Sequence, residues 1–209
     1  ENGVSLIDVI GSTSTPMGAR MVRKWLLFPL KNIDKIKQRI NIVDFFVQKP
    51  ELLKEVLKLL KDIGDLERML AKVSTLRISP RELNRFKESL ILSEQLQTFL
   101  LSNTKSKNIS SLLSTYNTTQ SIIDKLSEYL DPDAPVLLSK GGVINSGVNH
   151  ELDSYRELAN QSEKILTEIK NREIDKTGIP SLKIAYNNVF GYYLEVRNTH
   201  KDKVPEDWI

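Results

Sequence analysis

Apolar residues recur every three or four positions along most of the chain, which is the period of an amphipathic α-helix. The pattern predicts helices over 16–28, 33–48, 51–63 and 80–101, and two shorter ones around 112–116 and 122–130. Thr15 and Ser79 each precede a proline, as helix N-caps do, and Glu82 completes a capping box with Ser79. Gly64 is expected to form the left-handed cap that ends the third of these helices.

The longest periodic element is predicted over residues 148–176. Positions 152, 155, 159, 162, 166, 169 and 173 alternate steps of three and four and form an imperfect heptad seam. Such a seam is typical of an antiparallel helix pair or a short coiled coil. A helix of this length spans about 40 Å, at 1.5 Å per residue.

The pattern changes at Thr177-Gly178-Ile179-Pro180, after which β-branched and aromatic residues dominate. Residues 181–196, with a turn signal at Asn187-Asn188, predict a β-hairpin. We therefore expect a mainly α protein with long antiparallel helices that ends in a small hairpin. The boundary is predicted at 176–181, which gives a helical domain over 1–177 and the root of a second, β-rich domain over 178–209. That second part is too short to bury a core of its own.

The composition of the chain limits the kinds of site that it can contain. The chain has 209 residues, with 30 Lys and Arg against 27 Asp and Glu, a net charge of +3. That balance excludes a strongly basic or acidic tail. The chain has no cysteine and only two histidines, His150 and His200, which disfavours disulfides and metal sites and fits a reducing, cytoplasmic setting.

Neither a membrane span nor a secretory leader is predicted. The chain starts at Glu1 and stops at Ile209, just after Pro205, and both ends look cut. We expect it to be part of a longer protein.

No constellation of catalytic residues is apparent. The Gly-x4-Gly-Lys-Ser/Thr string of a phosphate loop is absent, and Gly141-Gly142 is expected to be a flexible turn. No Gly-x-Ser-x-Gly elbow occurs, and the acidic residues from Glu51 to Asp65 are expected to pair with neighbouring lysines on helix surfaces. We predict no catalytic residue, no metal ligand and no cofactor within the chain.

Two basic clusters remain as candidate sites. The first holds seven cations against one acid, namely Arg20, Arg23, Lys24, Lys31, Lys35, Lys37 and Arg39 against Asp34. It could bind phosphates, form a solvated helix surface, or face an acidic neighbouring domain. The second follows the predicted hairpin and comprises Arg197, His200, Lys201 and Lys203 against Asp202. Basic residues on loops beside strands commonly contact nucleic-acid backbones, although a solvated loop would look the same.

Three motifs, in order, resemble MutS-type DNA mismatch-repair proteins. Residues 10–30, which include Ser-Thr-Pro-Met-Gly-Ala-Arg, resemble the opening of that family's core domain. Residues 63–68, Ile-Gly-Asp-Leu-Glu-Arg, look like its "D-L-E-R" step, and residues 178–196 are similar to the entry into its clamp. Gly11 departs from the family pattern, which usually has an aspartate there.

The resemblance implies a core domain whose long lever helices join an ATPase domain to a DNA-gripping clamp. The mismatch-reading and connector domains would precede Glu1, and the ATPase and dimerisation domain, which binds ATP and Mg²⁺, would follow Ile209. The implied partners are double-stranded DNA, a second subunit of the same protein and repair factors of the MutL type, and the implied location is the bacterial cytoplasm at the nucleoid.

On this interpretation Arg197, His200, Lys201 and Lys203 are the expected DNA-backbone contacts, and the first basic cluster faces protein domains instead. Two alternatives stay open. One is a MutS-like paralogue without a clamp, against which the string 178–196 argues. The other is a helical scaffold that binds proteins and not DNA, for which an uninterrupted coiled coil would be expected in place of the hairpin.

Overall fold

The computed structural model describes residues 3–206 and 208. Contacts between residues divide the chain into two compact units, Glu1–Val148 and Asn149–Ile209. Each unit is described by itself.

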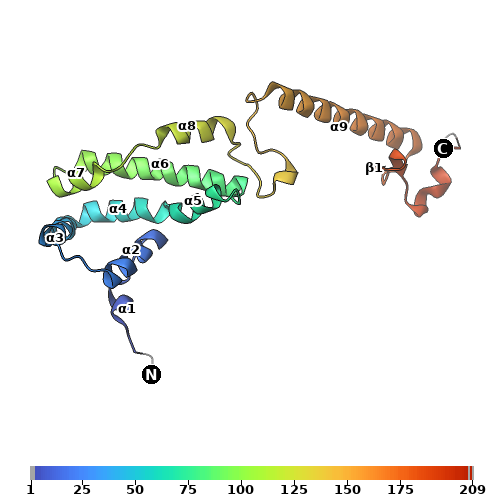
Figure 1. Cartoon of the computed structure of the whole chain (residues 1–209). Coiled ribbons are helices and arrows are strands. Elements are labelled where there is room, and N and C mark those ends of the chain that lie inside the picture. Colours follow the sequence, from blue (N-terminus) through green and yellow to red (C-terminus); the bar gives the residue numbers. More distant parts are fainter. Residues whose placement is uncertain (1–2, 207, 209) are drawn as a thin grey trace. The chain divides into compact units, whose positions relative to one another are not determined.

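The regular structure of the described residues of the first unit consists of helices and one isolated β-bridge. Its α-helices are α1 (Leu6–Ile10), α2 (Pro16–Leu27), α3 (Ile33–Val47), α4 (Pro50–Asp62), α5 (Leu66–Ser74), α6 (Pro80–Asn103), α7 (Lys107–Leu113) and α8 (Gln120–Tyr129). A single 3₁₀ turn, η1, follows at Leu138–Lys140. Figure 1 shows α6 antiparallel to α4 and α5 on one side and to α8 on the other, so the predicted antiparallel helical architecture is confirmed.

The predicted helix starts are confirmed at the two proline-containing caps. The Thr15 hydroxyl accepts a hydrogen bond from the Gly18 N–H at 3.0 Å. The Ser79 hydroxyl accepts from the Glu82 N–H, and the Glu82 carboxylate accepts from the Ser79 N–H at 3.1 Å, which completes the capping box. The pattern missed α1 and α5, which are short, and it placed the helix before Tyr116 a few residues too late.

Helix α6 is shared by both hydrophobic cores of the unit. Its first half contributes Phe86 and Leu90 to a cluster with Met69 of α5 and Ile123 of α8. Its second half contributes Leu100 to a cluster with residues of α3, α4 and α7, namely Val56, Ile109 and the partly buried Ile42, Phe46 and Leu113. Each core therefore uses a different stretch of the same 24-residue helix.

Polar side chains of α6 also hold two loops. The buried Asn84 amide donates to the carbonyls of Asp131 at 2.7 Å and Pro132 at 3.1 Å. The Glu94 carboxylate accepts from the backbone N–H of Thr119 and from its hydroxyl, just before α8 begins. These hydrogen bonds favour the ionised form and lower the pKa of Glu94.

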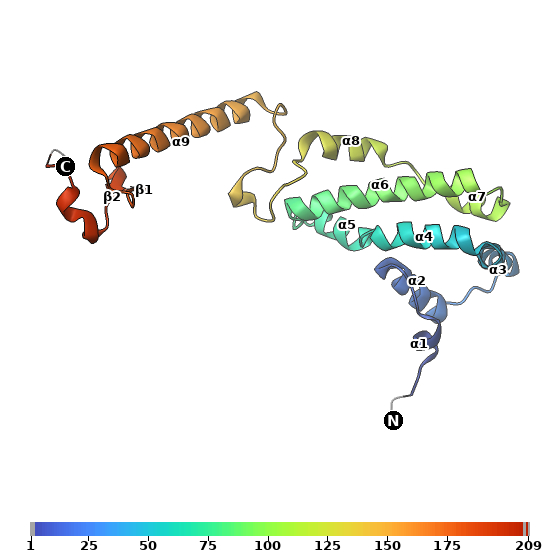
Figure 2. The ribbon, with the colours of Figure 1, turned by 180° about the vertical axis from the view of Figure 1, so that it is seen from behind.

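The second unit joins a long helix to a hairpin. Helix α9 (His150–Thr177) begins at the N-cap Asn149, whose side chain accepts from the Leu152 N–H, and ends at Gly178 in the left-handed conformation. Strands β1 (Lys183–Asn187) and β2 (Gly191–Glu195) pair antiparallel, with Lys183 opposite Glu195. Ile179 and Leu182, almost inaccessible to solvent, fill the junction between helix and hairpin. The predicted long helix and hairpin are thus confirmed (Figures 1 and 2).

The heptad seam of α9 is only partly covered. Leu166, Ile169 and Glu173, near the hairpin, are half-buried, whereas Tyr155 is 61% exposed. No side chain of α9 is fully buried within the described part of the chain. The seam is therefore covered where α9 meets β1 and open along its middle.

Gly64 does not cap α4 as predicted. Ile63 ends that helix in an extended conformation, and Gly64 is absent from the glycines with positive φ. Its N–H instead donates to the Ser89 hydroxyl of α6 at 3.0 Å. A Cβ at this position would lie 2.9 Å from both the Ser89 Oγ and the Met69 Cε, so a larger residue fits only if these side chains shift. Glycine is therefore favoured here by close packing and not by a positive φ.

Gly64→Ala should therefore destabilise the chain by about 1–3 kcal/mol, the usual cost of overpacking a well-filled core. The measurement is urea unfolding of the 209-residue chain. Gly3→Ala serves as the control because nothing lies within 4 Å of the added Cβ. Equal unfolding midpoints for the two variants would contradict a packing requirement at Gly64.

Candidate nucleic-acid interface

The hairpin gives the second unit its only regular β-structure among the described residues. Ile184 and Leu194 form one cross-strand pair, and Tyr186 and Tyr192 form a second pair nearer the tip. The two tyrosine rings meet edge-to-face with centroids 5.1 Å apart, a favourable geometry for aromatic pairs. These two cross-strand pairs stabilise the register of the hairpin.

The predicted turn lies where Asn187-Asn188 placed it. The Asn187 side-chain oxygen accepts from the N–H groups of Val189 at 2.9 Å and Phe190 at 2.7 Å. Gly191 closes the turn with a φ of +74°, a conformation that other residues adopt at a cost. Val189 and Phe190 are 82% and 79% exposed at the tip.

The four predicted DNA-contact residues lie together on the segment after β2. Arg197 is the N-cap of a short 3₁₀ element, η2 (Asn198–Lys203), which is kinked at His200. Arg197, Lys201 and Lys203 are exposed, whereas His200 is half-buried. None of the four side chains forms an ion pair with a residue that the structure describes. Asp202 and Glu206 in the same segment reduce its net charge.

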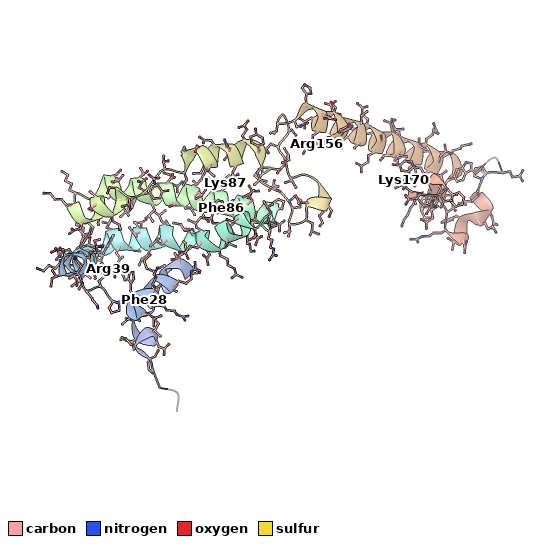
Figure 3. All side chains as sticks on the ribbon, viewed as in Figure 1. Phe28, Arg39, Phe86, Lys87, Arg156 and Lys170 are labelled. Atoms are coloured by element: carbon pink, nitrogen blue, oxygen red, sulfur yellow. The ribbon has the colours of Figure 1, made fainter. Side chains whose placement is uncertain are left out.

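Two lysines that the sequence analysis did not single out lie near the hairpin. Lys170 of α9 and Lys183 of β1 line one open cavity of about 470 Å³, together with Tyr186 and Tyr192. Figure 3 labels Lys170 on the α9 surface. Their separation in sequence hid this proximity, because it arises only when β1 folds back on α9.

The first predicted basic cluster is partly neutralised within the fold. Arg20 of α2 donates to both carboxylate oxygens of Asp65, at 2.8 and 2.6 Å, and to Glu67 at 2.9 and 2.6 Å. The Arg39 guanidinium of α3 lies 3.7 Å from the centroid of the Trp25 ring, a cation–π contact. Figure 3 labels Arg39 near the start of the bundle.

Asp65 both caps α5 and binds Arg20, and the residues next to it in the sequence predict neither contact. It accepts from the Arg68 N–H at 3.2 Å as the N-cap of α5, and it binds Arg20. Hydrogen bonds from Arg20 are the main reason that the pKa of Asp65 is lowered, and the same bonds raise the pKa of Arg20. The expectation that Asp65 pairs with neighbouring lysines is wrong: its partner is an arginine 45 residues earlier.

The described residues provide neither of two further kinds of site. No helix in that part of the chain is long and apolar enough to cross a membrane. No group of three or more His, Asp or Glu there is arranged to hold a metal ion.

Comparison with known proteins identifies the fold. The model of the family MutS domain III matches residues 1–183. The chain is 46% identical over 210 residues to the DNA mismatch repair protein MutS of Parabacteroides distasonis. It is also 46% identical over 209 residues to the DNA mismatch repair protein MutS of Phocaeicola vulgatus. Each alignment covers 100% of this chain and 24% of the relative. The MutS of Christiangramia forsetii is also 46% identical, over 99% of this chain and 24% of its own length.

The helical architecture and these matches together define the class of protein as a MutS core domain. The chain belongs to the MutS domain III family. It spans about a quarter of the length of the curated relatives it matches. The predicted boundary between domains at 178 stays a prediction: the compact units divide before α9, and the family match continues into β1.

The turn that positions the basic segment depends on the conformation of Gly191. Gly191→Ala should weaken the hairpin by about 1–2 kcal/mol, because a Cβ disfavours the left-handed region by that amount. Gly191→Asn should cost less, because asparagine tolerates this region. Hydrogen exchange of residues 183–195 measures the effect, and equal protection in both variants would contradict it.

Proposed function

We propose that this chain is the core and lever part of a DNA mismatch-recognition protein, and that it couples an ATPase domain to a clamp that holds duplex DNA by its backbone. The observation that carries this proposal is a basic segment, without ion-pair partners in the described structure, that follows the hairpin at the end of a long helix in a chain of the MutS domain III family. The relatives that it matches are named DNA mismatch repair proteins.

The junction between α9 and the hairpin supports the mechanical half of the proposal. A continuous 28-residue helix spans about 42 Å and keeps its backbone hydrogen bonds within itself. Ile179 and Leu182 are buried directly after it, so the end of the helix and the hairpin are packed as one body. A displacement of α9 would therefore be passed to the hairpin and to the basic segment behind it.

The basic segment supports the DNA half. Contacts with DNA phosphates need cationic side chains that are accessible and not already paired. Arg197, Lys201 and Lys203 are exposed and have no ion-pair partner in the described structure. His200 is the weakest candidate of the four because it is half-buried. By contrast, Arg20 and Arg39 are already engaged within the fold. Lys170 and Lys183 are additional candidates on the same unit.

The ATP and Mg²⁺ of the proposed parent protein belong to a part of it outside this chain. A phosphate-binding loop must lead directly into a helix N-terminus. Gly141-Gly142 leads instead to the Leu130–Ile144 bridge, and α9 begins only at His150. The Gly141-Gly142 loop therefore lacks the geometry of a phosphate-binding loop.

The partners follow from the same proposal. They are double-stranded DNA, a second subunit of the parent protein and downstream factors of the MutL type, acting in the bacterial cytoplasm at the nucleoid. The competing function is a helical scaffold without DNA binding, and the first experiment below separates the two.

Lys201→Glu combined with Lys203→Glu, in the full-length protein, should weaken binding to matched and mismatched duplexes alike, by about tenfold or more near 0.1 M salt. Loss of two phosphate contacts should also lower the salt dependence of the affinity by about two counterions. Fluorescence anisotropy with labelled duplexes at several salt concentrations measures both effects.

The matched control is Lys105→Glu with Lys107→Glu, a pair of exposed lysines at the same spacing beside α7. It should leave both affinities unchanged. Loss of mismatch preference with normal binding to matched DNA would refute backbone contact, and equal affinities for both double variants and the unmodified protein would favour the scaffold.

The chain on its own should not hydrolyse ATP. The measurement is phosphate release by the purified 209-residue chain, with the full-length protein as the positive control. Turnover that survives repurification and scales with the amount of chain would overturn the assignment of catalysis to other domains.

A further inference from the structure

Helix α2 lies against the rest of its unit with half-buried side chains such as Met17 and Val22 but without a fully buried one. None of its residues is buried, and Met21, Leu27 and the adjoining Phe28 are 52%, 74% and 72% exposed. An open cleft of about 530 Å³ lies along it, lined by α2 side chains together with Leu30, Arg39 and Glu67. In Figure 2, α2 lies to one side of the layer formed by α4 and α5.

Charged groups supply the contacts that apolar burial does not. Arg20 reaches α5 with all three guanidinium nitrogens, which donate to the carboxylates of Asp65 and Glu67. A guanidinium that binds two carboxylates in this way is held both by charge and by geometry. The side chains of Arg20 and Glu67 remain 47% and 65% exposed, so water and salt compete for the contact.

The contact joins α2 to α5, whereas on its other side α2 is held to α3 by the Arg39–Trp25 cation–π contact. Residues 28–32 link α2 to α3 without helical structure. On the other side, Asp65 caps α5 as well as binding Arg20, so the start of α5 receives any change at α2 directly. The α3–α8 bundle has its own cores, to which α1 and α2 contribute no buried residue.

We propose that Arg20 is an electrostatic latch. While its guanidinium binds Asp65 and Glu67, α2 is docked on α5. When that contact opens, α2 moves about the side where residues 28–32 and the Arg39–Trp25 contact join it to α3, and the α3–α8 bundle stays folded. The latch lies within the first unit and does not depend on DNA binding by the second.

The experiment is peptide-resolved hydrogen–deuterium exchange on the full-length protein that contains this chain. Arg20→Ala should raise the exchange rate of the α2 amides, residues 18–27, by about tenfold or more, because the charge-assisted hydrogen bonds that hold the helix are lost. Amides of α6 and α8 should exchange as in the unmodified protein.

Salt provides a second measurement that needs no variant. Raising the salt from about 0.05 M to about 1 M screens exposed charges and should accelerate α2 exchange in the unmodified protein. The same change should have little further effect in Arg20→Ala, where the latch is already open. This arm decides the question even if Arg20→Ala does not fold.

Two variants serve as controls. Asp65→Asn keeps a side-chain acceptor for the Arg68 N–H while it removes the charge, so α5 should stay capped and α2 should loosen. Lys24→Ala removes another exposed cation of α2 that forms no ion pair in the described structure, and it should change nothing.

Two results would overturn the latch. One is α2 exchange that responds neither to Arg20→Ala nor to salt. The other is faster exchange throughout α3–α8 in Arg20→Ala, which would show that Arg20 holds the whole unit together and not α2 alone.

Discussion

The first unit depends on the burial of α6 along its whole length. Phe86 and Leu90 serve one core and Leu100 serves the other, so the continuity of this helix is what joins the two clusters. The capping box at Ser79 and Glu82 fixes where the helix begins, and Asn84 and Glu94 fix two loops to its sides. Apolar burial, which is not directional, is thereby converted into a definite arrangement of neighbouring helices.

Local signals in the sequence were sufficient for the longer helices, the proline-containing starts and the hairpin turn, but not for the short helices α1 and α5. They failed where the decisive contact is distant. Gly64 looks like a helix cap in sequence, yet it lies in close contact with Ser89 on another helix and donates its N–H to the Ser89 hydroxyl. Asp65 looks like a surface acid, yet it binds Arg20. The candidate site divides in the same way: the basic segment at 197–203 was visible as composition, whereas Lys170 and Lys183 come together only through the packing of β1 on α9.

The charge of the chain has different uses in its two units. In the first, the densest cationic stretch is tied into the fold through Arg20 and Arg39, so part of its charge serves attachment between helices. In the second, the cations behind the hairpin remain without ion-pair partners in the described structure. Counting charges along a sequence cannot separate these cases, because each depends on whether a carboxylate or an aromatic ring is folded against the cation.

The open middle of α9 has a consequence for its stiffness. A helix is stable in water mainly through the packing of one face, and intrinsic propensity alone leaves it marginal. Tyr155, Ala159 and Ser162 of the seam are exposed in the described structure, whereas Leu166 and Ile169 are half-buried beside the hairpin. The stability of the helical conformation therefore varies along α9: it is higher at the hairpin end and lower in the middle. The stiffness with which α9 transmits a displacement then depends on what covers the exposed part of its heptad seam.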